Sequence, residues 1–588
     1  MNPLPQRITP LEAVRLLRSD VLAAMTLPAA VTNEQRFLVW WVLSGHREYA
    51  ATQVPLSEQQ QRFLFSPLPG WPVKGGVGMN LLLRSLFANR PDLQDAFDIT
   101  SPVGVWDAVA WFYIIGIKEL GLGCFVDSQT LRDLNSPAFT DSAGLQPSWL
   151  MVLVWHKHAQ LQEAFDLTAA GGRLGLMRWF AQRGIQQFGL QALVLPQAAA
   201  PAPLLPVAAR TQGGTAKPAY GVNLIGFAFG ELGIGEDVRM AAQACADAGV
   251  PFKVLNIEPG RHLRQADRLV APHCTGDIAE LPYAINLFCL TGFETLRVFA
   301  EKGPALFDGR YNIGWWPWEL PVWPQRWKQA FSVVDEVWAA TRFTQTMFSA
   351  ATDRPVTYMP LPVSVDRMHK TSRRALGLPA KKFLFLFIFD FNSYLARKNP
   401  MAVIQAFQAA FPIADRSVGL VLKTMNSRPQ NAAWLEFVQS CAADPRIVLL
   451  DHTLDREVVL GLVNACDAYV SLHRSEGFGR TLAEAMLLGK PVVGTDFSGN
   501  TDFLNKKTGF PVKWSKQWVE VGAYPFIEAD DGAYWAEPDT LHAAQQMRAA
   551  KAAAGADYAI QLIKKVEPMF STKVIGARMH ANLQRIKL

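Results

Sequence analysis

Short apolar runs alternate with amphipathic helical patterns over most of the chain beyond its first third. The clearest case lies at 468–504. Apolar runs at 468–472 and 491–495 have the length and β-branched content of buried strands. Between them, a glycine-containing turn leads into a segment that predicts a helix with Thr481 as its N-cap and Gly489 just past its end.

The same alternation continues on both sides of that stretch. Further strands are predicted at 221–229, 252–257, 284–290, 311–318, 336–341, 356–360, 383–389 and 418–422. Helices are predicted at 237–248, 400–410 and 540–554. Strands that alternate with helices in this way favour parallel, doubly wound sheets of the α/β class.

The first 190 residues carry a weak internal repeat instead. The segment 93–100, LQDAFDIT, recurs at 161–168 as LQEAFDLT, and in both copies a Trp follows the Phe by fourteen residues and a Gly follows the Trp by five. The landmark residues are Trp111 and Gly116, Trp179 and Gly184, and, in a fainter copy, Met25, Trp40, Gly45 and Glu48. This spacing predicts stacked helical hairpins, each with a buried Trp and with Gly at the helix end.

The composition is that of a globular protein with several domains. Half of the 588 residues are hydrophobic and 18% are charged. The most apolar run, 383–389, is strand-sized, and the N-terminus shows no charged-then-apolar leader. The six cysteines form no C-x-x-C pair, so neither a zinc site nor a disulfide framework is indicated, and a reducing cytoplasm fits best.

The chain is mildly basic, with a net charge of +6 and a pI near 8.9. This charge is compatible with anionic nucleotide ligands and with contact to an acidic membrane surface. The Lys and Arg residues are dispersed, and no basic helix or RNA-binding aromatic motif is present, so nucleic-acid binding is not indicated.

The turn at 473–479 carries the candidate chemistry. A strand, a glycine turn and a helix place unpaired backbone N–H groups and the positive end of the helix dipole at one point, which suits a phosphate. Glu476 in the turn and Glu484 in the helix can flank one ligand from two sides, and sugar or ribose hydroxyls would donate to them. A bare pair of glutamates at this spacing is more often two solvated side chains.

The surrounding residues resemble the donor-binding segment of the family 4 retaining glycosyltransferases of GT-B fold. The matching segments are Ser475-Glu476-Gly477-Phe478-Gly479, Ala483-Glu484-Ala485 and Gly489-Lys490-Pro491-Val492-Val493. The resemblance implies that Glu476 touches the transferred sugar and that Glu484 binds the nucleotide ribose. It also implies donor contacts from the start of the helix, at Gly477, Phe478, Gly479, Arg480 and Thr481.

The resemblance implies a lysine at the donor diphosphate, and Lys398 matches it. Many relatives carry an arginine five residues earlier, where this chain has Ser393. Arg397 or Lys423 is expected to supply that charge, or else the phosphates are held less tightly.

The first lobe contributes two further candidate regions. Gly233 and Gly235 lie in a loop that resembles the family loop near the donor phosphates and the acceptor, with a simple tight turn as the alternative. The aromatic run 315–321 contains the acceptor-side candidates Trp318 and Glu319, although ordinary packing is the favoured interpretation of its tryptophans.

Together these features predict an α/β protein with two facing doubly wound Rossmann-like lobes of GT-B type after an all-α N-terminal domain. The expected division is an α-helical repeat domain at 1–194, a Pro/Ala-rich linker at 195–217, an acceptor-side lobe at 218–363, a donor-side lobe at 364–514, and C-terminal helices at 515–588 that pack across the lobes.

The predicted activity is a metal-independent, retaining transfer of a hexosyl group from a nucleotide diphosphate sugar, with Glu476 and Lys398 as the catalytic residues and no cofactor. The acceptor would be a glycan, a lipid-linked molecule or a protein, in bacterial surface polysaccharide or glycoconjugate assembly, in the cytoplasm or peripheral to the inner membrane. Alternatives are a protein O-glycosyltransferase, an epimerase or phosphorylase of the same fold, and a non-catalytic scaffold. Acceptor binding, partner binding and oligomerisation all remain open for the helical domain.

Overall fold

The computed structural model describes residues 7–21, 31–49, 54–139, 144–195, 218–259, 263–428 and 430–587. The chain forms two compact units. The helical unit comprises Thr9–Gly214 and Ala300–Gly303, and the sheet unit comprises Met1–Ile8, Thr215–Phe299 and Pro304–Leu588. The predicted linker lies outside the described residues from position 196 to 217.

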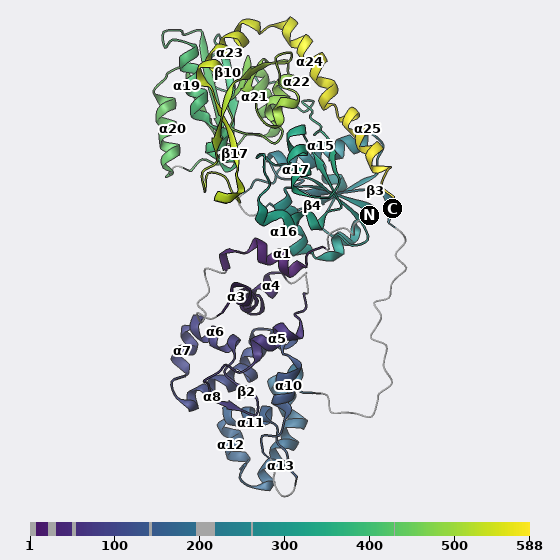
Figure 1. Cartoon of the computed structure of the whole chain (residues 1–588), viewed down its shortest axis with the longest axis vertical. Helices are drawn as coiled ribbons and strands as arrows, with labels where there is room; N and C mark the ends of the chain where they lie inside the picture. The colour runs from purple at the N-terminus through teal and green to yellow at the C-terminus, as the bar shows by residue number, and fades with distance from the viewer. Residues whose placement is uncertain are drawn as a thin grey trace. The chain divides into compact units, whose positions relative to one another are not determined.

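The helical unit is built from short helices and a small antiparallel pair, β1 (Val73–Lys74) and β2 (Val77–Gly78). Its helices are α1 (Pro10–Leu17), α3 (Asn33–Trp40), α4 (His46–Glu48), α5 (Glu58–Phe65), α6 (Leu81–Asn89), α7 (Pro91–Ala96), α8 (Pro102–Trp111), α9 (Ile117–Glu119), α10 (Ser128–Asn135), α11 (Trp149–Lys157), α12 (Ala159–Ala164), α13 (Ala170–Trp179) and α14 (Ile185–Phe188) (Figure 1). Capping boxes at Thr9, Thr32 and Ser57 fix the starts of three of them, because each hydroxyl accepts from a backbone N–H that has no partner inside its helix.

Among the described helices, α3, α8 and α13 each continue into a π-helical turn that ends at a glycine. The turns are Trp41–Gly45, Phe112–Gly116 and Phe180–Gly184. A Cβ on these glycines would lie 2.7, 3.2 and 3.0 Å from the rings of Trp40, Trp111 and Trp179, respectively. The prediction that these glycines end their helices is wrong: each has a helical φ of −59°, and its missing side chain makes room for a Trp ring inside a continuing helix.

In the first two of these segments, an arginine also lies over the tryptophan ring, a different arginine in each. The pairs are Arg18 with Trp40 at 4.8 Å and Arg90 with Trp111 at 5.7 Å. Each arginine forms an ion pair with a glutamate that follows the π turn, Glu48 for Arg18 and Glu119 for Arg90. The two segments therefore repeat one set of contacts as well as a set of residues.

The first lobe of the sheet unit holds a parallel sheet with the strand order β5-β4-β3-β6-β7-β8-β9. Its strands are β3 (Ala219–Gly226), β4 (Phe252–Asn256), β5 (Cys274–Thr275), β6 (Tyr283–Cys289), β7 (Tyr311–Trp315), β8 (Glu336–Ala339) and β9 (Val356–Tyr358). The helices between them are α15 (Gly233–Asp247), α16 (Gly292–Lys302) and α17 (Arg342–Ala351).

The second lobe holds another parallel sheet, ordered β12-β11-β10-β13-β14-β15. Its strands are β10 (Phe383–Ile388), β11 (Val418–Thr424), β12 (Ile447–Asp451), β13 (Ala468–Ser471), β14 (Val492–Thr495) and β15 (Phe510–Val512). Its helices are α18 (Leu395–Lys398), α19 (Pro400–Ala410), α20 (Ala432–Ala442), α21 (Arg456–Ala465), α22 (Arg480–Leu487) and α23 (Thr540–Ala553). An antiparallel hairpin, β16 (Trp514–Trp518) and β17 (Tyr534–Pro538), follows β15 in the chain.

The predicted fold class is confirmed: two doubly wound parallel sheets follow a helical region. Each predicted strand coincides with an observed one, whereas β5, β12, β15 and the hairpin of β16 and β17 were not predicted. The short pair β1 and β2 was not predicted either, since the N-terminal domain was expected to be all-α. The predicted strand at 311–318 is too long, because β7 ends at Trp315, before Pro317, which has no N–H to donate to a neighbouring strand.

Two C-terminal helices complete the sheet unit. α24 (Ala556–Phe570) packs against α22, and α25 (Thr572–Leu583) packs against α15 of the first lobe. Where α24 ends, its Phe570 carbonyl accepts a hydrogen bond of 3.0 Å from the Val363 N–H, which belongs to the segment that joins the two sheets.

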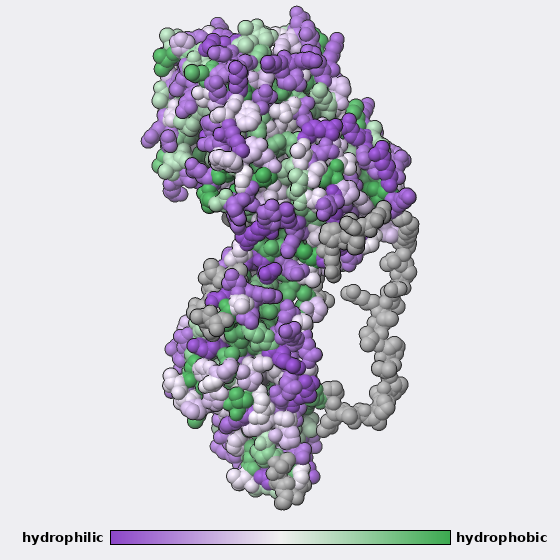
Figure 2. Space-filling model, viewed as in Figure 1, coloured by the Kyte–Doolittle hydropathy of each residue, from purple (hydrophilic) through white to green (hydrophobic). Residues whose placement is uncertain are grey.

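The surface of the sheet unit in the view of Figure 2 is mostly hydrophilic, with hydrophobic residues scattered among hydrophilic ones. Within the ranges that the structure describes, no helix is both long enough and apolar enough to cross a membrane. All six cysteines are unpaired, and four of them are buried.

Candidate functional site

The candidate site is centred on the turn between β13 and α22. Gly479 is the N-cap of α22, with φ +94°, a left-handed conformation that glycine adopts without strain. The prediction of Thr481 as N-cap is therefore wrong; Thr481 is the second residue of the helix. The end of the helix agrees with the prediction, since α22 stops at Leu487 and Gly489 follows with φ +71°.

Gly477 is a glycine for a different reason. A Cβ at this position would lie 2.7 Å from the backbone oxygen of Trp318, which belongs to the first lobe. The Gly477 carbonyl also accepts a 3.0 Å hydrogen bond from the hydroxyl of Thr341, at the start of α17. The turn before α22 is therefore fitted closely against the first lobe.

Glu476 lies in this turn beside two cations. The Lys398 ammonium donates to Oε1 of Glu476, and the Arg397 guanidinium lies 3.3 Å from the same oxygen. Burial alone would raise the pKa of Glu476, but Lys398 and Arg397 hold it at about 2. Burial lowers the pKa of Lys398, although Glu476 opposes this effect. Because its pKa is held at about 2, the Glu476 carboxylate is ionised at neutral pH.

A short strained segment holds both cations in place. α18 lies between Tyr394 and Asn399, two non-glycine residues with positive φ of +64° and +52°. Positive φ costs energy for residues with a side chain and often marks functional sites. Pro400 then begins α19, as predicted.

Arg397, one of the two residues expected to compensate for Ser393, is buried beside Glu476. Its guanidinium donates to the Ser475 carbonyl at 2.9 Å and lies 3.6 Å from Glu319 of the first lobe. Burial lowers the pKa of Arg397, but Glu319 and Glu476 raise it by a larger amount. The pKa therefore lies above its usual value, and the guanidinium stays charged. Lys423 is also buried, and its pKa is lowered for that reason, with Asp390 and Asp451 as opposing charges.

Of the two first-lobe candidates, only Glu319 offers a side chain to the site. Its carboxylate accepts from the hydroxyl of Tyr524, and its backbone oxygen accepts from Ser475. The ring of Trp318 is 2% exposed and packs against Phe293, Trp323 and Tyr524, so it has no free face on which a sugar could stack. The ring of Phe478 is similarly buried, against Phe503 and Phe570.

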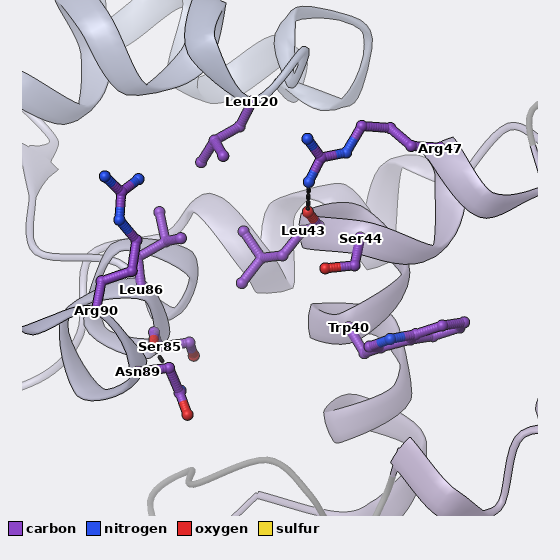
Figure 3. A pocket seen from close by; sticks show the side chains of 9 residues that line it. All are labelled: Trp40, Leu43, Ser44, Arg47, Ser85, Leu86, Asn89, Arg90 and Leu120. Atoms are coloured by element: carbon purple, nitrogen blue, oxygen red, sulfur yellow. Dashed lines mark hydrogen bonds between the residues drawn. The ribbon is translucent and has the colours of Figure 1, made fainter.

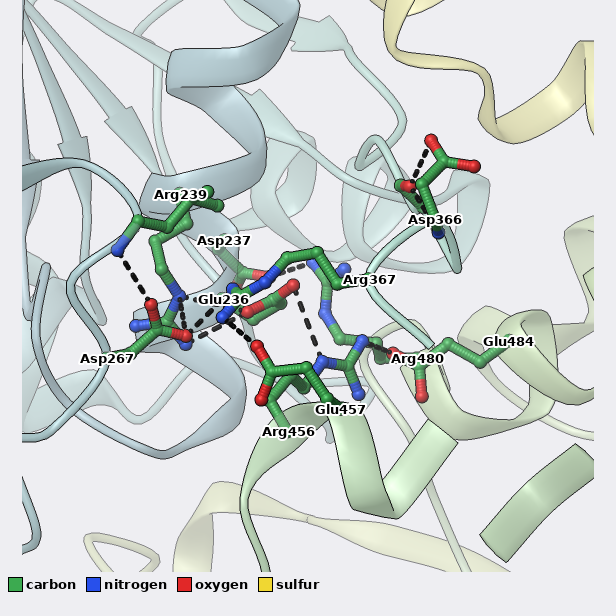
Figure 4. Close-up of polar contacts among 12 residues, drawn as sticks. Glu236, Asp237, Arg239, Asp267, Asp366, Arg367, Arg456, Glu457, Arg480 and Glu484 are labelled. Carbon is green, nitrogen blue, oxygen red and sulfur yellow. Dashed lines mark hydrogen bonds and ion pairs between the residues drawn. The ribbon is translucent and has the colours of Figure 1, made fainter. Parts of the chain in front are cut away.

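Glu484 lies inside α22 and is 1% exposed. Its Oε1 atom is 2.5 Å from Nη2 of Arg456, the first residue of α21. Nε of the same arginine is 3.5 Å from Glu236 of the first lobe, so the guanidinium lies between two buried carboxylates (Figure 4).

Arg480, at the first position of α22, pairs with Asp237 of α15 and donates to the Pro362 carbonyl at 3.2 Å. Burial raises the pKa of Asp237, although Arg480 opposes this effect. The glycine loop before Asp237 forms the first turn of α15, which begins at Gly233. Gly235 is required there, because a Cβ would lie 2.2 Å from the Gly230 carbonyl oxygen, whereas Gly233 faces open space.

Several supporting residues were not predicted. His473 is fully buried; burial lowers its pKa to about 4, and it makes 2.9 Å hydrogen bonds with Ser471 and Asn500. Ser498, with φ +70°, accepts from the Glu476 N–H at 2.8 Å. Their positions depend on contacts between β13 and the turn after β14, which no local pattern reveals. Arg456 likewise reads as an ordinary helix-start arginine.

The arrangement suits a ligand that carries both anionic groups and hydroxyl groups. Lys398, Arg397 and the amino end of α22 attract phosphate, since the first backbone N–H groups of a helix have no partner within it. The carboxylates of Glu476 and Glu484 accept from hydroxyls. Among the described residues, no three His, Cys, Asp or Glu side chains gather as a metal-binding group.

The helical unit contains a separate pocket of about 320 Å³, shown in Figure 3. It is lined by Trp40, Leu43, Ser44, Arg47, Ser85, Leu86, Asn89, Arg90 and Leu120. Ser44 and Ser85 are small, whereas Ile115 and Leu153 occupy the matching positions one repeat later, when the Trp residues are aligned.

Residues 384–520 match the family described as "Glycosyl transferases group 1". No curated protein matches the chain significantly.

Several solved structures are similar to the chain at low identity. Sucrose-phosphate synthase from Thermosynechococcus elongatus has a TM-score of 0.45 and 16% identity, over 62% of this chain and 99% of that one. HepE from Anabaena, in complex with UDP-glucose, has a TM-score of 0.44 and 16% identity, over 63% and 100%. The pneumococcal O-GlcNAc transferase GtfA, in complex with UDP and GlcNAc, has a TM-score of 0.36 and 16% identity, over 51% and 56%.

The matched range spans the six strands of the second sheet and includes Lys398, Glu476 and Glu484. The match to the glycosyl transferases group 1 therefore lies over the second lobe.

Proposed function

We propose that this protein is a retaining, metal-independent glycosyltransferase that moves a sugar from a nucleotide diphosphate sugar to a hydroxyl group. The observation that carries the proposal is the convergence of Lys398, Arg397 and the amino end of α22 on the buried carboxylate of Glu476. A diphosphate needs the cations and the helix end, and a sugar needs the carboxylate.

In the proposed reaction, the bond between the anomeric carbon and the diphosphate oxygen breaks, and the acceptor oxygen bonds to that carbon on the same face. The proton of the acceptor hydroxyl passes to the departing diphosphate. Lys398 and the N–H groups at the start of α22 stabilise the negative charge that develops on the leaving group. Glu476 orients the sugar by accepting from its hydroxyls.

Lys398 has a second role in this proposal. Without donor it neutralises Glu476; a donor diphosphate provides a second anion within reach of the same flexible ammonium. Sharing Lys398 between the two anions leaves the Glu476 carboxylate available to accept from the sugar.

The proposal includes three classes of acceptor. We place the acceptor hydroxyl on a glycan, a lipid-linked molecule or a protein, in bacterial surface polysaccharide or glycoconjugate assembly. Glu319 is the first-lobe carboxylate that comes nearest to the Arg397 and Glu476 pair, and it is the proposed acceptor-side residue.

The test uses donors, because it does not require the acceptor. UDP-, GDP- and ADP-glucose are each added to the full chain, and the thermal midpoint and the release of nucleotide are measured. One of them should raise the midpoint by mass action and be slowly hydrolysed. If all three remain intact and leave the midpoint unchanged, the proposal fails and the scaffold alternative is favoured.

Two variants then locate the chemistry. Glu476→Gln and Lys398→Met should each reduce nucleotide release by at least about a hundredfold, the usual size of an effect on a charge-stabilising group. Matched controls are Glu436→Gln and Lys381→Met, at exposed positions, which should release nucleotide at the wild-type rate. Near-normal release by either site variant would remove that residue from the mechanism.

A further inference from the structure

A chain of alternating charges runs from the first lobe to Glu484 (Figure 4). Asp267 lies 3.3 Å from Arg239, which pairs with Glu236 at 2.9 Å. Glu236 lies 3.5 Å from Arg456, which contacts Glu484 at 2.5 Å. The chain therefore crosses from α15 to α21 and α22 without an interruption.

The first-lobe end of this chain is held firmly. Arg239 is 2% exposed and donates to the carbonyls of Ala228 at 3.0 Å and Gly230 at 2.9 Å, in the turn before α15. Burial would raise the pKa of Glu236, but Arg456, Arg239 and Arg480 hold it at about 2. Glu236 is therefore a fixed, ionised group that faces the second lobe.

Within this series of charged side chains, Arg456 is the residue that contacts both Glu236 and Glu484. Its guanidinium is planar, so the ion pair with Glu236 on the Nε side, at 3.5 Å and without a hydrogen bond from Nε, turns Nη2 toward Glu484. The contact engages Oε1 of Glu484, and Oε2 is the acceptor that remains for a hydroxyl donor. The side chains of Glu236 and Glu484 are 5% and 1% exposed, respectively, so bulk water screens neither charge effectively.

We propose that Arg456 is a positioning residue for the nucleoside part of the donor, and that Glu236 of the first lobe holds Arg456 in place. Arg456 fixes the carboxylate of Glu484 at the orientation in which it accepts from the ribose hydroxyls. A residue of the acceptor-side lobe thereby sets the affinity for the ribose. This inference rests on the proposed function, which makes ribose the ligand of Glu484.

The experiment compares ribose with a sugar that lacks its hydroxyls. UDP, GDP and ADP, and the 2′,3′-dideoxy form of each, are titrated calorimetrically into the wild-type chain. The nucleotide that binds should do so at least about tenfold more tightly than its dideoxy form, as expected for a hydrogen bond to a charged acceptor.

Arg456→Met should reduce this ratio to near one and leave the affinity for the dideoxy form within about twofold of the wild type, since only the hydroxyl contacts are lost. Glu236→Gln should reduce the ratio by a smaller amount, and the double variant should resemble Arg456→Met, because the two residues act in series. Arg456→Lys, which keeps the charge without the fork, should also lose discrimination. Arg374→Lys and Glu436→Gln, at exposed positions, are the matched controls and should keep the wild-type ratio.

The possible failures can be told apart. If the wild type binds none of the three nucleotides, the proposed function fails and this inference fails with it. If the wild type discriminates between ribose and dideoxyribose but Arg456→Met and Arg456→Lys discriminate equally well, the inference alone is overturned. A general loss of structure would weaken binding of both nucleotide forms and leave their ratio unchanged, which also counts against a positioning role.

Discussion

The two glutamates of the candidate site are each paired with a cation rather than left as isolated buried charges. Glu476 contacts Lys398 and Arg397, and Glu484 contacts Arg456. Lys398 and Arg397 keep the Glu476 carboxylate ionised in a poorly hydrated position, where an unpaired carboxyl group would take up a proton. Glu476 can therefore accept hydrogen bonds at neutral pH.

The charge of Glu476 should be visible in the acid stability of the protein. Its pKa falls from 4.5 to about 2 on folding, so its stabilising contribution is complete above about pH 4.5 and is lost as the pH falls toward about 2. Glu476→Gln removes this contribution and leaves the buried Lys398 without its anion, at a cost of about 3–5 kcal/mol at neutral pH.

The gap between the thermal midpoints of the wild type and Glu476→Gln should thus be steady from about pH 7 to about pH 5 and should narrow at lower pH. Scanning fluorimetry across this range measures it, with the exposed Glu436→Gln as the control. A gap that stayed constant down to about pH 3 would show that Glu476 is not held at a low pKa.

At the scale of single elements, the sequence was most informative where local chemistry decides the structure. Apolar runs located the strands, and Pro400 located the start of α19. It was least informative where the packing of side chains decides. Gly116 resembles a helix terminator, but its function is to leave space for the ring of Trp111, which lies on the same helix one turn earlier.

This role of the glycine leads to a prediction for the helical unit. In Gly116→Ala the new methyl group would meet the Trp111 ring at 3.2 Å and the Phe112 ring at 3.4 Å, in a core that has little space to give. Overpacking of this kind costs about 1–3 kcal/mol. The unfolding transition of the helical unit should therefore shift to lower temperature in scanning calorimetry.

The matched control is Gly171→Ala, near the start of α13, where a Cβ would meet nothing within 4 Å. This variant should unfold at or slightly above the wild-type temperature, because alanine favours the helix. Equal stability of the two variants would contradict the packing role of Gly116.

At the scale of the whole molecule, the contacts between the two lobes were beyond the reach of sequence analysis. The resemblance indicated Glu476, Glu484 and Lys398, but it gave no indication of the pairs Glu236 with Arg456 and Asp237 with Arg480. The partners in these pairs are more than 200 positions apart in the chain, and each reads locally as a solvated side chain. Only the packing of the two sheets brings them together.

The helix α25 is part of the same large-scale arrangement. A Cβ at Gly576 would lie 2.2 Å from the backbone oxygen of Ala244 in α15, where no side chain can move aside. Gly576→Ala should therefore separate the two helices and lower the unfolding temperature of the sheet unit by several degrees, for a cost of about 1–3 kcal/mol.

Calorimetry on the full chain measures this effect, since the transition of the helical unit serves as an internal reference. Gly276→Ala, at an exposed site where a Cβ meets nothing within 4 Å, is the control and should leave both transitions unchanged. An unchanged transition in Gly576→Ala would mean that α25 contributes little to the stability of the first lobe.

The backbone passes between the lobes at two places, between β9 and β10 and after α24, and the hydrogen bond from Val363 to Phe570 links these two passages. A protease cut between β9 and β10 would leave the two lobes without a covalent link, joined by the packing of α25 on α15 and by the other contacts between the lobes. Such a nicked protein should still migrate as a single species under native conditions and separate only when denatured.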